Sequence, residues 1–438
     1  MYFGTRDTNF LFEPGKLTTT LDGSAGSSGK GKLGAFITEH ADNWQFCCNG
    51  FSPQAGHWVK NDDGKEYFYQ TLNSCAYQPY YEKMYLGPGA IIELPALLDE
   101  IKKNNVATHR LGISPVCGIL QDQDSAFERG EVDLDGNPLP VRGDGTMSKG
   151  STCHGVGAAL ARRRLRRPDT LLARDIPELA PYLCDVPREI MDRLDHGQAG
   201  LLEIAQGYQL SYLLPEFYPF CTSRNCSVAA GLDDMMLPPC YAGNVLLNYR
   251  TFPIRISNYK YICKEDVHIA PPCDTELGQH FKAGQHLTWG EVQMFNDNGK
   301  SYEKYEGNSG PGYPDQVETD WDTITRESGS QDPIMEMTSV TKLPRRVFTI
   351  SRTNIEDSIR ANRANGEVFI SVNFANYVDA ELLYARGRAW GASAITGNVG
   401  HSVDTTKIYD WCRRNVPREK GKLTFLGTGP RTDDFLMV

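Results

Sequence analysis

The chain has 438 residues, and its 40% hydrophobic and 23% charged content is that of a soluble globular protein. The formal net charge of −10 argues against a nucleic-acid partner, and no apolar run approaches the length of a membrane span. The start of the chain does not read as a signal peptide, and the twelve cysteines include no C-x-x-C pair. We therefore expect reduced thiols, a cytoplasmic location and no membrane partner.

A glycine- and serine-rich loop follows a β-branched run at residues 17–22 and precedes a helix-like pattern that begins near Leu33. Glycines let backbone N–H groups approach an oxyanion closely, a helix N-terminus adds positive potential, and Lys30 adds a full charge. The order strand, loop, helix therefore predicts a phosphate-binding loop. It is not a strict Walker A loop, because Ser24 stands at the first glycine and Gly31 follows the lysine. A plain turn before a helix is the alternative.

Further elements are expected in the first third of the chain. Strand-like residues 43–48 run into a turn-rich loop that ends at His57, and a hairpin is expected around residues 61–64. Apolar residues at helical spacing predict a helix across residues 94–101. Residues 122–150 are polar and glycine-rich, which favours a mobile loop.

The second half of the chain continues the alternation of strands and helices. Short apolar strands are expected at residues 201–207, 368–373 and 423–427, and a helix is expected at residues 354–364. Polar residues follow the strands, as they do where parallel strands end at the binding edge of a sheet. The pattern predicts an α/β fold with a mainly parallel central sheet flanked by helices.

The chain shows neither an internal repeat nor a domain linker, so residues 1–438 are expected to form a single domain. Residues 270–335 are expected to form a loop-rich insertion. Within that insertion, residues 296–333 hold many Gly, Asn, Asp, Ser and Pro residues and little periodic pattern.

Six short motifs, in order along most of the chain, resemble those of the adenylosuccinate synthetase family. They are GSSGKGK at 26–32, QAGH at 54–57, STCHGVG at 151–157, EIAQG at 203–207, YPFCTS at 218–223 and GTGP at 427–430. Each motif is weak alone, but six in the same order make the resemblance specific. The resemblance implies a P-loop-NTPase-like fold, a homodimer, and a ligase that joins L-aspartate to the 6-position of a purine nucleotide, driven by a nucleoside triphosphate with Mg²⁺.

The resemblance also implies roles for single residues. Ser27, Lys30 and His57 take the catalytic positions, and Ser27 and Gly56 take the positions of magnesium ligands. The triphosphate is expected at Gly26, Ser28, Gly29, Gly31, Lys32, Gly56, Asn373, Asn376, Gly429 and Pro430. The purine nucleotide and aspartate are expected at Gln54, Ser151, Thr152, Arg166, Gln206, Thr222, Val340, Thr341 and Arg345.

Plainer interpretations stand beside these roles. Lys30 could be a surface lysine, His57 a structural hydrogen-bonding residue, and Gln206 a core amide. The basic run at residues 162–167 could be a solvated face. The family places an arginine there that crosses to the nucleotide phosphate of the partner subunit, and the register within the run stays open.

Three departures from the family pattern indicate different nucleotides. Ser27 replaces an aspartate that takes the purine N1 proton, and a smaller, neutral serine can exchange hydrogen bonds with a 2-amino group, which favours guanine. Residues 373–376 replace a segment whose aspartate reads guanine in the triphosphate, and an amide there favours ATP or dATP. Leu343 replaces an arginine that reaches the ribose, so a 2′-deoxy substrate would lose less.

These departures resemble a phage branch of the family that acts on dGMP in the pathway to diaminopurine DNA. The expected reaction joins L-aspartate to the 6-position of dGMP, with ATP or dATP, and gives 2-amino-2′-deoxy-N6-succinyladenylate. An ordinary IMP- and GTP-dependent synthetase is one alternative. A catalytically inactive nucleotide-binding module is the other, because the loop lacks the family's aspartate. The retained His57, Lys30 and Gln206, and the adjacent Arg345 and Arg346, speak against loss of activity.

Overall fold

The computed structural model describes most of the chain. The described residues are 7–54, 56–139, 153–256, 259–263, 302–306, 309–337, 344–390, 393–395, 402–417 and 419–438.

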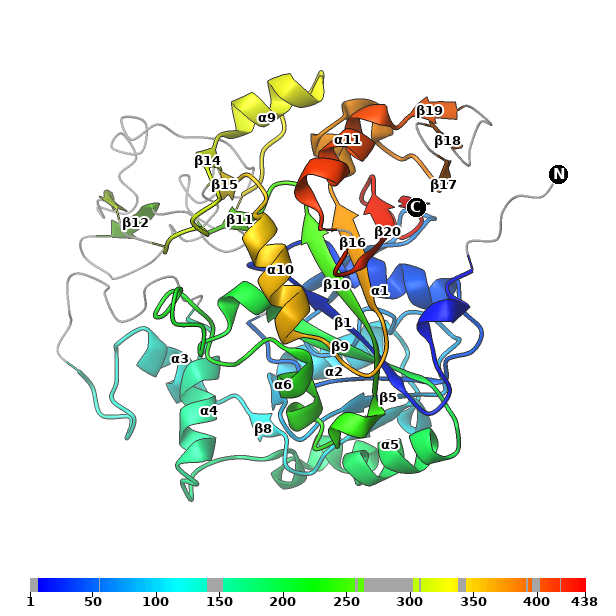
Figure 1. Ribbon diagram of the computed structural model, residues 1–438. Helices are drawn as coiled ribbons and strands as arrows, with labels where there is room; N and C mark the ends of the chain where they lie inside the picture. The colour runs from blue at the N-terminus through cyan, green and yellow to red at the C-terminus, as the bar shows by residue number, and fades with distance from the viewer. Residues whose placement is uncertain are drawn as a thin grey trace.

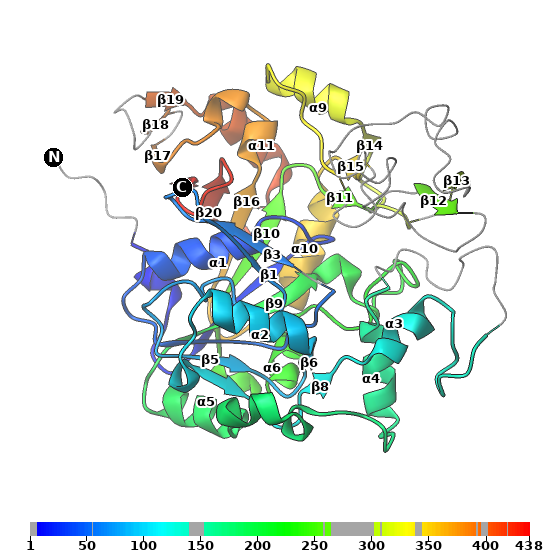
Figure 2. The ribbon, with the colours of Figure 1, turned by 180° about the vertical axis from the view of Figure 1, so that it is seen from behind.

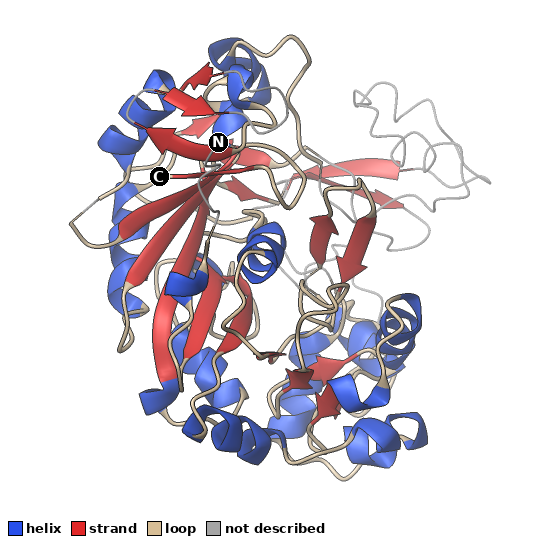
Figure 3. Cartoon of the chain, turned by 90° about the vertical axis from the view of Figure 1, so that its right-hand side faces the viewer, coloured by secondary structure: helices blue, strands red, loops and turns tan. Residues whose placement is uncertain are grey.

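A large twisted sheet runs through the molecule (Figures 1 and 3). Within the described residues it has twelve strands: β1 (Leu17–Asp22), β2 (Phe46–Asn49), β5 (Lys83–Leu86), β7 (Leu111–Ile113), β9 (Gly200–Gly207), β10 (Ala242–Arg250), β16 (Val368–Asn373), β17 (Gly387–Trp390), β18 (Ser393–Ile395), β19 (Ser402–Asp404), β20 (Lys422–Gly427) and β21 (Phe435–Met437). Their order is β19-β18-β17-β21-β20-β16-β10-β1-β9-β2-β5-β7. All strands from β20 to β7 run parallel, and β21 is antiparallel to β20. The expected mainly parallel sheet is confirmed.

Helices cover both faces of this sheet. One face packs against α5 (Val186–Asp195), α6 (Val228–Asp234), α10 (Arg352–Ala361) and α11 (Thr406–Asn415). The other face packs against α1 (Lys30–Glu39) and α2 (Leu94–Lys103) (Figure 2).

Alternate residues of each central strand serve the two faces. Val245 and Leu247 belong to the first layer and Leu246 to the second, as the alternation of side chains along a strand requires. Every residue of β1 and β10 is therefore buried.

Smaller elements extend from this core. They are the hairpin of β3 (His57–Lys60) and β4 (Glu66–Tyr69), the pair β6 (Ile91–Ile92) and β8 (Gly118–Ile119), the sheet of β11 (Ile254–Arg255), β15 (Arg346–Phe348) and β14 (Glu318–Thr319), the pair β12 (Tyr259–Cys263) and β13 (Tyr302–Glu306), and the helices α3 (Asp122–Glu128), α4 (Val156–Arg164) and α9 (Trp321–Ser328). The hairpin around residues 61–64 is confirmed. Among the described residues, no helix combines the length and apolar character that crossing a membrane requires.

Two expectations of irregular structure are wrong in part. The range 122–150 contains α3, which begins with a capping box in which the Asp124 carboxylate accepts the Gln121 N–H at 2.9 Å. The range 296–333 contains α9, which Asp320 caps and which buries Trp321 and Ile324. Both helices are short, so few buried positions mark them, and their caps lie among the polar residues that suggested loops.

Candidate functional site

The loop between β1 and α1 lies where the central parallel strands end. The carboxylate of Asp22, the last residue of β1, accepts the N–H of Ser24 at 2.8 Å and the N–H of Ser28 at 3.3 Å, and it also accepts the Ser28 hydroxyl. Burial raises the pKa of Asp22, while the bonds from Ser28 and Ser24 and the charge of Lys30 lower it. Asp22 therefore holds both ends of the loop, at Ser24 and at Ser28, through hydrogen bonds to one buried carboxylate.

Side chains from neighbouring elements hold the loop's carbonyl groups. The amides of Asn248 and Asn373 each donate to the Ser28 carbonyl at 2.8 Å. Arg250 donates to the Ser27 carbonyl at 2.9 Å, and Asn354 of α10 donates to the Gly23 carbonyl at 2.9 Å. The carbonyl oxygens of Gly23, Ser27 and Ser28 are thus satisfied by donors from within the protein and are not available to a ligand.

The loop's donors remain available. Within the described part of the chain, no acceptor binds the N–H groups of Gly26, Ser27, Gly29 or Lys30. Gly29 is the N-cap of α1, has φ of 81° and contributes no capping side chain. N–H groups that converge at an uncapped helix N-terminus form a cradle for an oxyanion. The loop therefore has the geometry that the binding of a phosphate group requires, and its role as a phosphate-binding loop stays a prediction.

Ser27 occupies the exposed tip of the loop. Its φ is 54°, in the left-handed region that non-glycine residues rarely adopt. Its side chain is exposed, whereas the side chain of the adjacent Ser28 is buried. The hydroxyl of Ser27 can therefore meet a ligand that sits on the loop.

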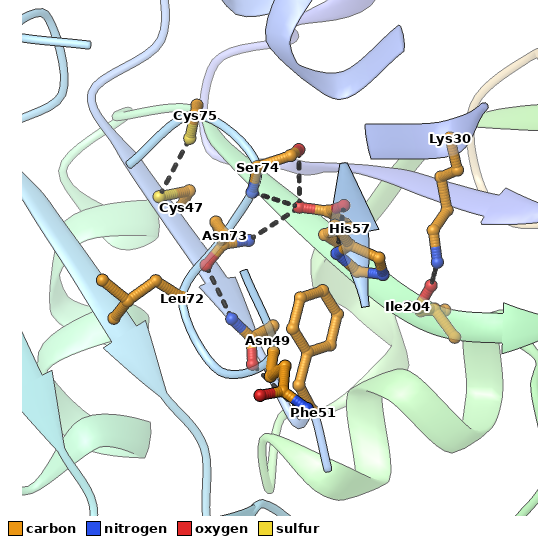
Figure 4. Close-up of polar contacts among 12 residues, drawn as sticks. Lys30, Cys47, Asn49, Phe51, His57, Leu72, Asn73, Ser74, Cys75 and Ile204 are labelled. Carbon is orange, nitrogen blue, oxygen red and sulfur yellow. Dashed lines mark hydrogen bonds and ion pairs between the residues drawn. The ribbon is translucent and has the colours of Figure 1, made fainter. Parts of the chain in front are cut away.

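Both lysines of the loop motif are buried. The ammonium of Lys30 donates to the Ile204 carbonyl (Figure 4), and burial lowers its pKa against the opposing charges of Glu203 and Asp22. The ammonium of Lys32 donates to the Gly429 carbonyl at 2.8 Å, and burial lowers its pKa to about 7. Lys30 is therefore not the surface lysine of the alternative interpretation. A polyphosphate bound nearby would favour the charged form of both lysines.

His57 lies at the start of β3 and is buried beside Phe51, whose ring centroid is 4.4 Å away in an edge-on arrangement (Figure 4). Its Nδ1 lies 3.2 Å from a carboxylate oxygen of Glu203. Burial lowers the pKa of His57, and Lys30 lowers it further, while Glu203 opposes both. Nδ1 of His57 therefore faces the Glu203 carboxylate, and Nε2 is the ring nitrogen left for another partner.

Glu203 is itself held firmly in the middle of β9. Its second carboxylate oxygen accepts the N–H and the hydroxyl of Ser74, both at 3.0 Å, and the Asn73 amide at 3.4 Å. Burial alone would raise the pKa of Glu203, but the charges of His57 and Lys30 outweigh it, so the pKa is lowered. Glu203 is therefore an anion that supports His57.

Two glycines allow the loop to pack closely against β9 and α1 to pack closely against His57. A Cβ on Gly207, at the end of β9, would lie 2.1 Å from the Ser24 carbonyl oxygen of the loop. A Cβ on Gly31 would lie 3.1 Å from the Cβ of His57. The glycines of the loop and of the EIAQG motif thus serve close backbone packing as well as ligand access.

Other predicted residues lie around this centre. The Gln54 amide donates to the Thr222 hydroxyl at 3.4 Å, which brings two predicted substrate residues together. Gln206 has φ of 61° at the end of β9, and the Cys226 thiol lies 3.9 Å from its amide oxygen. Arg166 is exposed beyond the end of α4.

The predicted triphosphate residues near the C-terminus differ in exposure. Gly429 binds Lys32 through its carbonyl, and Pro430 is exposed. Asn373 is buried and donates to Ser28 and to the Asn248 side chain, so its amide supports the loop in this structure. Asn376 is half-buried, and its side chain bonds to none of the described residues. Ser151, Thr152, Val340 and Thr341 lie outside the described residues.

The donor set suits magnesium only in combination with a ligand. Ser27 and Gly56, the predicted ligands, offer a neutral hydroxyl and a neutral carbonyl, and both residues are exposed. Magnesium commonly takes most of its remaining oxygens from phosphates and water. Among the described residues, the acidic and histidine side chains close enough to share a metal are Glu39, His40 and Asp433, at the opposite end of α1 from the loop.

Five residues of the site were not among the predicted ones: Asp22, Glu203, Asn248, Arg250 and Asn354. Four of them are buried polar residues within apolar strands or at the ends of such strands, and that pattern was a usable signal. Their partners lie far along the chain, which local patterns do not reveal.

A parallel α/β sheet with an anion-binding loop at its edge defines a nucleotide-binding protein of the P-loop type. Residues 23–176 match the family model of adenylosuccinate synthetase. The chain is thus similar to the adenylosuccinate synthetase family, and the relatives below extend that similarity along the chain.

Two curated relatives show the range of the similarity. The chain is 28% identical over 423 residues to the N6-succino-2-amino-2′-deoxyadenylate synthase of Vibrio phage phiVC8, which spans 94% of this chain and 96% of that protein. It is 30% identical over 242 residues to the adenylosuccinate synthetase of Methanocaldococcus jannaschii, or 55% of this chain and 65% of that protein.

Solved structures extend the comparison to three dimensions. The succinoaminodeoxyadenylate synthetase of cyanophage S-2L, bound to dGMP and dATP as an energy donor, aligns with a TM-score of 0.67 and 25% identity over 96% of this chain and 95% of that one. The fully ligated adenylosuccinate synthetase of Plasmodium falciparum aligns with a TM-score of 0.61 and 13% identity over 97% of this chain and 100% of that one, and shares the fold.

Proposed function

We propose that this chain is a carbon–nitrogen ligase that joins L-aspartate to the 6-position of dGMP, with ATP or dATP as phosphoryl donor. The product is 2-amino-2′-deoxy-N6-succinyladenylate. The observation that carries the proposal is the exposed Ser27 at the tip of an otherwise complete phosphate loop. The near full-length similarity to the phage synthase, and to a structure that holds dGMP and dATP, supports the same purine and the same donor.

The reaction needs a good leaving group at C6 of the purine. The γ-phosphoryl group of the triphosphate moves to O6, and the purine N1 gives up its proton to solvent. The amine of aspartate then attacks C6, phosphate leaves with the O6 oxygen, and the nitrogen of the new C6–N bond loses one proton. The free N–H groups of the loop and the ammonium of Lys30 bind phosphate oxygens and offset their charge. A bound Mg²⁺, held by phosphates with Ser27 and Gly56, would supply further neutralisation of charge.

His57 is proposed to act on the moving phosphoryl group. The Nδ1 of His57 lies 3.2 Å from Glu203, so a proton on Nδ1 faces that carboxylate. In that tautomer Nε2 donates a hydrogen bond only when the ring is protonated. The charges of a bound polyphosphate and of Glu203 raise the pKa of the ring and so favour that form. Ser27 orients the purine and does not take a proton, because a serine hydroxyl has no useful basicity near neutral pH.

A matrix of substrates tests the proposal. Phosphate release would be measured for IMP, GMP and dGMP, each with ATP, dATP or GTP, with and without L-aspartate. We expect the highest aspartate-dependent rate with dGMP and an adenine triphosphate. Equal or better use of IMP with GTP would identify an ordinary adenylosuccinate synthetase, and no aspartate-dependent release in any pair would identify an inactive nucleotide-binding module.

A further inference from the structure

A buried arginine touches both the phosphate loop and a second part of the site. Arg250 ends β10 and is completely buried. Its guanidinium donates to the Ser27 carbonyl at 2.9 Å and, with both terminal nitrogens, to the two carboxylate oxygens of Glu336, one of them at 3.1 Å. It also lies over the ring of Phe374, 4.1 Å from the centroid. One rigid planar group therefore fixes two segments at once.

Glu336 belongs to the segment that carries the predicted aspartate ligand. The Glu336 carbonyl accepts the Arg345 N–H at 2.9 Å, and the neighbouring residues Met337 and Pro344 form an antiparallel bridge. The hydroxyl of Tyr377 donates to the Glu336 carboxylate at 3.1 Å. Glu336 and Arg345 thus lie opposite each other beside this isolated bridge.

The charges of this segment point to an external carboxylate. Burial alone would raise the pKa of Glu336, but Arg250 outweighs it, so the pKa is lowered and the pair is ionic. Arg345 donates to the Met337 carbonyl at 3.1 Å, and among the described residues no carboxylate forms an ion pair with it. Glu336 is occupied by Arg250, which leaves Arg345 able to bind an added anion.

A buried ion pair alone is weak support for a functional role, because such pairs are often purely structural. The third contact distinguishes this one. Arg250 holds the carbonyl of Ser27, a residue whose φ is left-handed and whose side chain is exposed at the tip of the loop. Rotation of that peptide unit would redirect the Ser27 side chain.

We propose that Arg250 and Glu336 are positioning residues that link the purine-facing Ser27 to the aspartate-facing Arg345. The proposal rests on the proposed function for what binds at each end. A change in the position of Ser27 would move the guanidinium of Arg250. That shift would in turn move Glu336 and the neighbouring Arg345. Purine selection and aspartate binding therefore both depend on the contacts of Arg250.

Kinetics of two variants test this link. Glu336→Gln keeps the shape and removes the charge, and Tyr377→Phe removes only one hydrogen bond to Glu336. The matched control is Glu189→Gln on α5. It removes the charge of a carboxylate that forms an ion pair with Lys83 at 2.8 Å. We expect Glu336→Gln to raise KM for aspartate roughly tenfold and to lower the preference for dGMP over IMP by a similar factor. Tyr377→Phe should shift both in the same direction but less, and the control should shift neither.

Hydrogen exchange gives a readout that does not need activity. In Glu336→Gln, backbone amides of residues 23–30 and of residues 344–348 should both exchange faster than in the unmodified protein, whereas Glu189→Gln should change neither segment. A lower melting temperature with unchanged KM values, unchanged purine preference and unchanged exchange at residues 23–30 would overturn the link. If the unmodified protein does not convert dGMP, the proposed function fails, and the exchange result still decides whether the two segments are linked.

Discussion

At the scale of single residues, we propose that one side chain, that of Ser27, determines the choice of purine. Ser27 sits at the exposed tip of the loop, and Arg250 holds its carbonyl from behind. A carboxylate at this position would crowd a 2-amino group, because it is larger than a hydroxyl and carries a charge. The smaller serine hydroxyl leaves room for the 2-amino group of guanine and can accept a hydrogen bond from it.

Ser27→Asp should therefore depress turnover of dGMP. The unmodified protein should use dGMP better than IMP, and the variant should reverse or flatten that preference, because the added carboxylate restores the residue that accompanies hypoxanthine in the wider family. The measurement is the initial rate with dGMP and with IMP at a fixed concentration of the triphosphate. Ser28→Ala is not a suitable control, because the Ser28 hydroxyl donates a hydrogen bond to Asp22. A variant that keeps the full rate with dGMP would contradict this role of Ser27.

His57 is the second residue whose chemistry can be isolated. His57→Ala should fold and bind dGMP and dATP almost normally but lose roughly 10²–10³ in kcat, the cost of about 2.7–4 kcal/mol for one donor that acts mainly in the transition state. His57→Asn retains a donor on a shorter arm and should lose less. Steady-state kinetics and equilibrium binding separate kcat from affinity. Full kcat in His57→Ala, or failure of that variant to fold, would make the histidine structural.

At the scale of elements, the first turn of α1 carries a buried ammonium. The folded pKa of Lys32 is about 7, and the ordinary value is 10.5. Between these values the unfolded chain binds a proton that the folded chain does not, so this residue makes the free energy of unfolding rise with pH. Below about pH 7 the cost of burying the charge is present in full.

Lys32→Met should remove this contribution. The difference in unfolding free energy, unmodified protein minus variant, should rise by up to about 1.4 kcal/mol per pH unit between about pH 7 and pH 10. Urea unfolding of both proteins across that range gives the difference, in which the other titrating groups cancel. A difference that is flat with pH would show that Lys32 stays protonated in the folded protein.

The helices, strands and loops were predictable from the sequence where the pattern that defines them is local. The glycine loop between β1 and α1, the hairpin that contains His57, and strands β9, β16 and β20 all follow from residue order and spacing. Helices α3 and α9 were missed because caps and two or three buried residues define them. Arg250 was missed because its meaning depends on Glu336, which lies 86 positions away in the sequence. Glu203 stood within a recognised motif, but its role appears only when β3 brings His57 against β9.

At the scale of the whole molecule, the parallel sheet gathers its functional residues at one edge. Strands β1, β9, β10 and β16 are neighbours and end together, so residues from four distant parts of the chain surround one loop. The basic run lies in the last turn of α4 and just beyond it, away from that loop (Figure 1). Its members at residues 162–167 are divided between contacts within the chain and exposure to solvent.

Contacts within the chain narrow the choice among these arginines. Arg162 is buried against Asp124. Arg167 pairs with Asp135 at 2.6 Å and with Asp169 at 3.1 Å. Arg164 and Arg166 are exposed, and among the described residues neither forms an ion pair. If the protein is a homodimer with shared sites, these two side chains are the ones free to cross the interface.

Mixing of inactive subunits tests that arrangement. A subunit with Arg164→Ala and Arg166→Ala would be combined with a subunit that carries Lys30→Ala, after denaturation and joint refolding. Each mixed dimer then has one site with both lesions and one site with neither, so random mixing should restore about a quarter of the normal activity. The matched control combines Lys30→Ala with His57→Ala, whose lesions lie in the same subunit's site, and it should restore nothing. Mixed dimers isolated with two affinity tags that remain as inactive as their parents would contradict a shared site, because an arginine that serves its own subunit cannot be supplied by the partner.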